Sequence, residues 1–276
     1  MGTIPSNPHD AFFRHVFTRA AEAASELRAV LPKEVVAVVD WNTLRVCKDS
    51  FVSVELRDRR SDILFHARID GHDGYIYVLV EHQSGVDDLM ALRMLEYTIN
   101  IWNHHLRTHP KSKRLPVVIP LVVYASRTNE RWDAPLDIAA LLDTGPDPDA
   151  LGDSLPHFRY QVDDLTAVDL PTLLHRPLTP VIRTMLVLQK AAPGNPHLTD
   201  TLWTLLPTLA TMFQGPHGNH DLHAVLTYII KVADTPFTQI KPIIDLLGPA
   251  AQEATMTTGD MLRAEGRAAG RAEGRA

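Results

Sequence analysis

The feature that most constrains the fold is a pair of strand-like runs separated by a short turn sequence. The first run covers Asp62 to Ile69 and the second covers Tyr75 to Glu81, and both are rich in aliphatic and aromatic residues. Between them, Gly71-His72-Asp73-Gly74 supplies the backbone freedom that a turn requires. The sequence therefore predicts an antiparallel hairpin at this point of the chain.

A long helix and a buried strand are predicted to follow the hairpin. Apolar residues recur at spacings of three and four from Val86 to about Leu106, which predicts an amphipathic helix; they are Leu92, Leu95, Ile99, Trp102 and Leu106. The run from Leu115 to Tyr124 is apolar and rich in β-branched residues, which is typical of a strand buried on both faces. This order of elements indicates an α/β fold with a mixed sheet.

The flanking segments extend this prediction. Asp10 can cap a helix that continues to about Val30. Short extended segments are expected over residues 43–47 and 51–56, and a last strand over 157–162, after a loop rich in Pro and Asp.

The residue pattern changes in the C-terminal part of the sequence and predicts a separate helical domain there. After about Leu174, apolar helical segments alternate with Pro and Gly breaks. We therefore expect an α/β domain over residues 1–175, a helical domain over 176–255 and a repeat tail over 256–276. In the tail an arginine recurs every fourth residue from Arg263 to Arg275. Interspersed glycines each cost a helix about 1 kcal/mol relative to Ala, so the tail is expected to be flexible.

Composition limits the classes of protein that the chain can belong to. The net charge of -6 means that nucleic acid must be bound through a local basic surface. Cys47 is the single cysteine, which excludes an intrachain disulfide and suits a reducing compartment. The longest apolar stretch, residues 115–125, is shorter than the roughly 20 residues of a membrane helix, and the N-terminus lacks the pattern of a signal peptide. We expect a cytoplasmic protein without a membrane partner.

Acidic side chains at the open end of the hairpin are the candidate site. If the turn is centred within residues 71–74, paired residue numbers sum to about 143 to 145, which places Asp62 opposite Glu81 to Gln83. Glu81 and Gln83 then point to one face. Neighbouring carboxylates repel unless a cation neutralises them, and hard oxygen ligands suit Mg²⁺, with Mn²⁺ as a substitute. The backbone carbonyl of His82 can complete the metal shell. Spacing alone equally allows Asp62 and Glu81 to be solvated charges.

Other side chains are weaker candidates. Glu55 precedes Asp62 and is a further candidate metal ligand. Arg93 and Tyr97 are one helical turn apart and can face the site, although Tyr97 suits the core equally well. Basic residues expected to contact phosphates on the active-site side are Arg57, Arg59, Arg60, Lys111, Lys113 and Arg114. Ordinary surface solubility explains these charges nearly as well.

Several strings in this region resemble the recombination-promoting nuclease (Rpn) family, also described as YhgA-type transposases. The resemblance covers about residues 8–175 and is carried by His9-Asp10-Ala11-Phe12-Phe13-Arg14, Arg59-Arg60-Ser61-Asp62-Ile63-Leu64-Phe65, Leu79-Val80-Glu81-His82-Gln83-Ser84, Leu92-Arg93-Met94-Leu95-Glu96-Tyr97 and residues 116–124. It implies a restriction-endonuclease-like PD-(D/E)XK core, with a mixed central sheet flanked by helices.

The resemblance also implies roles for the candidate residues. Asp62 and Glu81 bind the metal, and Gln83 takes the place of the superfamily's lysine. Because glutamine brings no positive charge to the transition state, this substitution puts catalytic strength in question.

The expected function is therefore a Mg²⁺-dependent DNA endonuclease linked to recombination or mobile-element transfer. A catalytically silent DNA-binding or interaction module with the same fold is the alternative. A nuclease acting on RNA would use the same metal chemistry. The C-terminal helical region is expected to mediate homo-oligomerisation or to help hold DNA.

Overall fold

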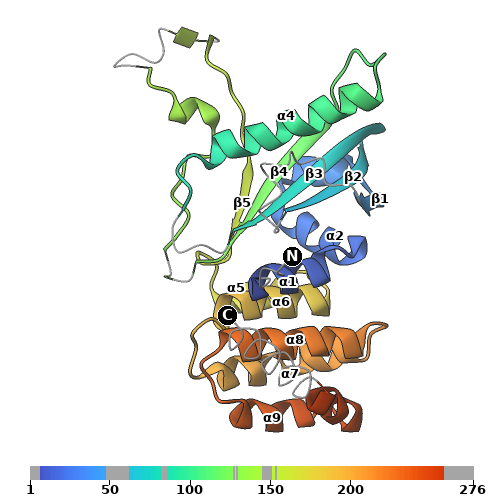
Figure 1. Cartoon of the computed structure of the whole chain (residues 1–276), viewed down its shortest axis with the longest axis vertical. Coiled ribbons are helices and arrows are strands. Elements are labelled where there is room, and N and C mark those ends of the chain that lie inside the picture. The colour runs from blue at the N-terminus through green and yellow to red at the C-terminus, as the bar shows by residue number, and fades with distance from the viewer. Residues whose placement is uncertain are drawn as a thin grey trace, which may run out of the picture. The chain divides into compact units, whose positions relative to one another are not determined.

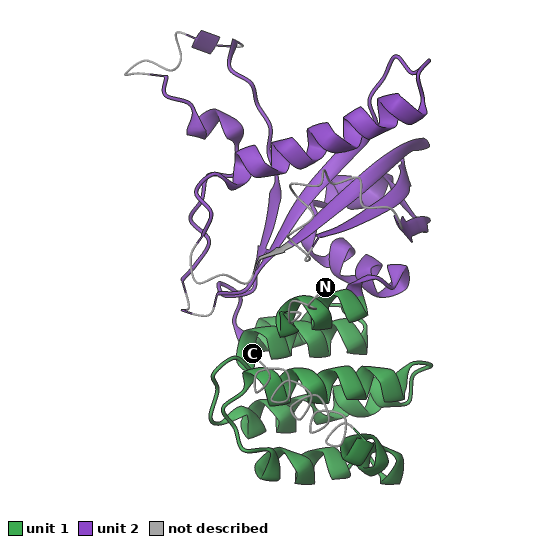
Figure 2. Cartoon of the chain, in the orientation of Figure 1, with its two compact units in different colours: residues 1–16, 170–276 green, residues 17–169 purple. Residues whose placement is uncertain are grey.

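The chain forms two compact units. The computed structural model describes residues 7–47, 62–81, 86–126, 128, 130–144, 151–152 and 154–257, without the side chains of Val80 and Glu81 (Figure 1). One unit spans residues 17–169, and the other joins residues up to 16 with those from 170 onward (Figure 2). We call them the sheet unit and the helical unit.

The sheet unit is built on a mixed sheet. Among the described residues it has five strands in the order β1 to β5, which are β1 (Val39–Val46), β2 (Asp62–Ile69), β3 (His72–Glu81), β4 (Val117–Tyr124) and β5 (Gln161–Asp164). β2 is antiparallel to both β1 and β3, whereas β3, β4 and β5 run parallel. The predicted hairpin, mixed sheet and apolar strand are confirmed, although the last strand begins at Gln161 rather than at residue 157.

The hairpin turn lies earlier than its glycine pattern predicts. Asp70 and Gly71 are the two central residues, with φ angles of 48° and 75°, and Ile69 pairs with His72. Positive φ at both central positions defines the two-residue turn that matches strand twist, and Asp-Gly is a favoured sequence for it. The register therefore pairs Asp62 with Leu79, and the predicted pairing with Glu81 to Gln83 is wrong.

Helix α4 (Met90–Thr108) provides the crossover that parallel strands β3 and β4 require. It lies along one face of the sheet (Figure 1). Its buried residues Met90, Met94, Tyr97 and Ile101 share a core cluster with β3 and β4 side chains such as Leu79. Of the apolar stripe that predicts the helix in the sequence, Leu95 also packs against this cluster, whereas Leu92, Ile99 and Leu106 are exposed.

The N-terminal segment forms two helices instead of the single helix expected to Val30. They are α1 (Pro8–Phe17) and α2 (Ala20–Val30), and α3 (Lys33–Val38) leads into β1. α2 lies against β1, and the Phe17 ring is 6.4 Å from that of Phe65 on β2. A short 3-10 helix, η1 (Ile138–Leu141), lies against α4. The strand expected over residues 51–56 lies outside the described residues.

The helical unit contains the predicted C-terminal helices and also most of α1. Its described helices are α5 (Leu170–His175), α6 (Pro180–Ala191), α7 (Leu198–Phe213), α8 (Gly218–Val232), α9 (Phe237–Asp245) and a helical segment over 249–257. The repeat tail from residue 258 onward lies outside the described residues.

Three side chains of α1 join it to α8. The rings of Phe12 and Tyr228 stack at 4.7 Å, and Nδ1 of His9 is 2.9 Å from the Tyr228 hydroxyl. His15 pairs with the buried Asp221 at 2.9 Å. The N-terminal helix thus belongs to the C-terminal unit up to residue 16, unlike the sequence boundary at 1–175, which keeps it with the sheet.

Candidate active site

The candidate acids lie at one edge of the sheet. β3 and β4 run parallel, so both end at this edge, and the antiparallel β2 begins there. Asp62 is the first residue of β2, and Glu81 is the last residue of β3. Glu81 is two residues beyond Leu79, which pairs with Asp62, and its own backbone pairs with Tyr124. The corrected register thus keeps both acids at one end of the hairpin.

Tyr77 holds the carboxylate of Asp62. Its hydroxyl donates a hydrogen bond to Oδ2 of Asp62 at 2.5 Å. Burial raises the pKa of Tyr77 well above its usual value of 10.0, and the negative charge of Asp62 adds to this increase. Tyr77 therefore stays protonated at neutral pH and remains a hydrogen-bond donor to a half-buried carboxylate.

Helix α4 contributes Tyr97 and Arg93 to the surroundings of Tyr77 and Asp62. The rings of Tyr77 and Tyr97 lie 4.7 Å apart, and burial raises the pKa of Tyr97, with a further increase from the charge of Asp62. Arg93 opposes that shift and donates to Oδ2 of Asp87 at 3.2 Å. Tyr97 is thus both a core residue and a neighbour of the site.

The remaining parts of the predicted site fall outside the described residues. These are the Glu81 side chain and the whole of Glu55, Arg57, Arg59, Arg60, His82 and Gln83. Sequence reasoning missed Tyr77, because the predicted turn gave the wrong register. The Asp70-Gly71 pair was the signal that would have placed Tyr77 diagonally across from Asp62.

Three basic candidates lie at the wrong end of the sheet for this site. Lys111, Lys113 and Arg114 precede Val117, which pairs with Gly74 beside the hairpin turn. Gly74 is seven residues before Glu81, or roughly 23 Å along β3. The expectation that this group lies on the Asp62 side is wrong, because α4 returns the chain to the starting end of the parallel strands.

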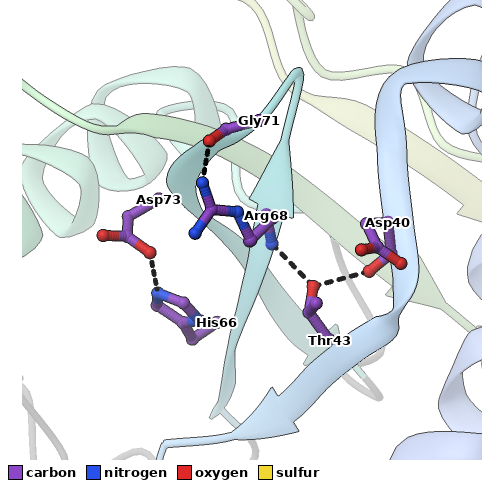
Figure 3. Close-up of polar contacts among 6 residues, drawn as sticks. All are labelled: Asp40, Thr43, His66, Arg68, Gly71 and Asp73. Carbon is purple, nitrogen blue, oxygen red and sulfur yellow. Dashed lines mark hydrogen bonds and ion pairs between the residues drawn. The ribbon is translucent and has the colours of Figure 1, made fainter.

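The hairpin turn end carries its own polar network (Figure 3). His66 pairs with Asp73 across β2 and β3 at 3.0 Å. Thr43 of β1 accepts a hydrogen bond from the Arg68 backbone at 2.8 Å and donates to the Asp40 carbonyl at 2.6 Å. The Arg68 guanidinium donates to the Gly71 carbonyl. These contacts tie the three antiparallel strands together, so a structural role accounts for them.

His66 is held neutral in this network. Burial lowers its pKa below 6.5, and the positive charge of Arg45 lowers it further, while Asp73 acts in the opposite direction.

The chemistry of the donor set at the Asp62 edge suits a hard cation. A half-buried aspartate held by a tyrosine offers an oxygen ligand, which Mg²⁺ and Mn²⁺ prefer. Within the described part of the chain, no group of three or more His, Cys, Asp and Glu side chains is arranged to hold a metal ion. Any site at this edge must therefore draw further ligands from the side chain of Glu81 or from residues that are not described.

The fold is that of a mixed α/β protein in which Asp62 and Glu81 lie at the sheet edge where the parallel strands end. Comparison with known proteins then gives the family. The chain belongs to the family described as putative transposase, YhgA-like, whose model matches residues 7–218.

Relatives in Escherichia coli are named recombination-promoting nucleases. RpnA of strain K12 is 29% identical over 269 residues, which cover 95% of this chain and 85% of that protein. RpnD of O157:H7 is 38% identical over 128 residues, which cover 46% of this chain and 49% of that protein. An inactive recombination-promoting nuclease-like protein, RpnE of strain K12, is 29% identical over 278 residues, or 98% of this chain. Named relatives therefore include both nucleases and an inactive protein.

Two further findings concern the fold and the helices. No solved structure matches the chain significantly. The fold is therefore described as mixed α/β, with helices flanking a mixed sheet. Within the described residues, no helix has both the length and the apolar character that crossing a bilayer demands.

Proposed function

We propose that this chain is a metal-dependent nuclease that hydrolyses phosphodiester bonds in DNA during recombination or mobile-element transfer. The observation that carries the proposal is the Tyr77-bound Asp62 carboxylate at the sheet edge where Glu81 also lies. The names of RpnA and RpnD, both recombination-promoting nucleases, support the reaction class. A restriction-endonuclease-like core is the fold that we propose for this chemistry.

In this proposal Asp62 and Glu81 bind Mg²⁺ or Mn²⁺, with the His82 carbonyl and Glu55 as further ligands. A bound cation would polarise the phosphodiester and lower the pKa of a water molecule. Tyr77 fixes the orientation of Asp62, and Gln83 orients the water or a phosphate oxygen. Phosphate contacts come from the arginines that precede Asp62 in the sequence, which are Arg57, Arg59 and Arg60.

A catalytically silent, DNA-binding protein is the second candidate. Two observations favour it: Gln83 occurs where the resembled superfamily has lysine, and the relative RpnE, named inactive, aligns with 98% of this chain. Without the lysine, the proposed site has one fewer positive charge to stabilise the transition state.

The test is cleavage of supercoiled plasmid DNA by the purified chain with Mg²⁺, with Mn²⁺ or with EDTA. We expect cleavage with either metal, and we expect Asp62→Asn and Glu81→Gln to reduce it to the EDTA level. Asp73→Asn is the matched control, since it removes an exposed carboxylate at the other end of the hairpin.

Three outcomes would count against the proposal. Cleavage that survives Asp62→Asn and Glu81→Gln would show that the site is misassigned. DNA binding without cleavage in any metal would favour the silent protein. Cleavage of RNA but not of DNA would replace the substrate.

A further inference from the structure

Helix α4 carries an apolar stripe on the side that does not face the sheet. Leu92, Ile99 and Leu106 are 41%, 42% and 41% exposed. The half-buried Leu95 and Trp102 lie between them at the edge of this side, where Leu95 also packs against the core cluster. We call these five residues the outer stripe. Scattered apolar side chains are normal on protein surfaces, but a continuous row along one helix indicates an interaction site.

The spacing of the outer stripe is that of a coiled-coil seam. Its members are separated by three, four, three and four residues, as are the a and d positions of a heptad repeat. The core-facing residues Met94, Tyr97 and Ile101 then occupy the c and f positions, on the opposite side of the helix. One face of α4 thus packs on the sheet while the other is patterned to pack on a helix.

We propose that the outer stripe binds the outer stripe of a second copy of this chain, with the two α4 helices antiparallel. In such a pair the a positions of one copy lie opposite the d positions of the other, so Ile99 meets Trp102 and Leu95 meets Leu106. The same patch serves both partners, as a two-fold symmetric dimer requires. The contact does not depend on the proposed nuclease function.

The distribution of charge along α4 favours a second copy of this chain as the partner. It also favours the antiparallel orientation. Asp87, Asp88 and Glu96 are acidic groups at the start of α4, where Arg93 pairs with Asp87, whereas Arg107 and Lys111 follow at its end. No acidic residue occurs between Glu96 and Glu130 in the sequence. Antiparallel packing brings the acidic end of each helix beside the basic end of the other and also opposes their dipoles. Parallel packing would place like charges together.

The folded sheet unit reduces the cost of this contact. The stripe spans residues 92–106, or about 21 Å, which is too short for an isolated helix pair to be stable. Here α4 is already held by its buried face, so association does not have to order the helix. Trp102 is also fixed in advance, because its Nε1 donates to the Pro116 carbonyl at 2.9 Å.

The first test is the mass of the full chain in solution by sedimentation at tens of micromolar. We expect a dimer that Ile99→Glu converts to a folded monomer with an unchanged circular dichroism spectrum, whose melting temperature no longer depends on protein concentration. Ile230→Glu is the matched control, since Ile230 is also a helical isoleucine, is 38% exposed and lies on α8 of the helical unit. It should leave the dimer intact.

The second test is the orientation of the helices. In a Cys47→Ser background, Leu95→Cys and Leu106→Cys chains should form a disulfide-linked dimer when mixed under mild oxidation. Neither variant should cross-link when it is alone.

Several results would overturn the proposal. These are a monomeric wild-type chain, a dimer that survives Ile99→Glu, and a dimer that Ile230→Glu disrupts equally. Cross-linking of each cysteine variant with itself would show that the helices are parallel. A monomer that dimerises only after residues 258–276 are removed would identify that tail as the occupant of the stripe.

Discussion

At the scale of single residues, the hydrogen bond from Tyr77 to Asp62 is the contact that most affects the candidate site. A carboxylate that loses part of its hydration needs donors to remain charged. Tyr77 is suited to this role, since burial keeps its hydroxyl protonated. The donor comes from β3, the strand that ends at Glu81, so one hairpin supplies both acids and the group that orients the first.

Tyr77→Phe removes this donor and keeps the ring. We expect Mn²⁺ affinity to fall by about 10- to 100-fold, as for other groups that orient metal ligands, and DNA cleavage at fixed metal to fall with it. Titration calorimetry with Mn²⁺ measures the affinity, and excess metal should restore part of the activity.

The matched control is Tyr228→Phe, which removes a buried hydroxyl contact with His9 in the helical unit. It should lower stability by about 1 kcal/mol and leave Mn²⁺ affinity unchanged. Equal Mn²⁺ affinity in Tyr77→Phe and the wild-type chain would show that Tyr77 does not orient a metal ligand.

At the scale of elements, the turn at Asp70-Gly71 fixes the register of the hairpin. Both residues have positive φ, a conformation that glycine adopts freely and aspartate tolerates better than most residues. The turn thereby pairs Asp62 with Leu79 and leaves Tyr77 diagonally across from the carboxylate. A slip of one residue would move every side chain of β3 to the opposite face.

Gly71→Ala should destabilise the sheet unit by about 1 to 2 kcal/mol. The φ of Gly71 is 75° and no atom lies within 4 Å of an added Cβ, so the cost arises from the backbone conformation rather than from a collision. Urea unfolding followed by fluorescence measures the change. Asp70→Asn should be close to neutral, because asparagine also tolerates positive φ; an unaltered stability in Gly71→Ala would contradict the turn assignment.

At the scale of the whole molecule, the beginning of the chain completes the helical unit. Phe12 stacks on Tyr228, and His15 pairs with Asp221, so residues distant in sequence share one core. The boundary between the units falls at residues 16 and 17, close to the break between α1 and α2. A helical unit that begins only at residue 170 would lack these contacts.

Phe12→Ala should destabilise the helical unit by about 3 to 5 kcal/mol, because it removes a buried aromatic ring. Hydrogen exchange measured by mass spectrometry should show faster exchange in α8, with β2 and β3 unchanged. Faster exchange confined to the sheet unit would show instead that α1 belongs with the sheet.

The proposed dimer would also change which basic residues lie near Asp62. If the α4 helices pack antiparallel, Lys111, Lys113 and Arg114 of the second copy lie near the start of α4 in the first copy. Asp62 lies at that end of the sheet, whereas the chain's own copy of this basic group lies at the other.

The sequence by itself determined the local elements of the sheet unit. Alternating and continuous apolar runs predicted β2, β3 and β4, and a helical period predicted α4, because these patterns reflect which sides of an element are buried. The order strand, helix, strand then indicated a mixed sheet, and the hairpin placed the two acids at one of its ends. The family strings placed Asp62 and Glu81 in the same region.

Only the tertiary structure decided which partner each face meets. Both stripes of α4 have helical spacing, and the contact of Tyr97 and Met94 with the sheet selected the buried one. The register depended on a choice between two glycine-containing turns. The partner of α1 depended on residues more than 200 positions away, such as Asp221. Periodicity is a local property that gives the orientation of a side chain, whereas its partner is set by packing between distant segments.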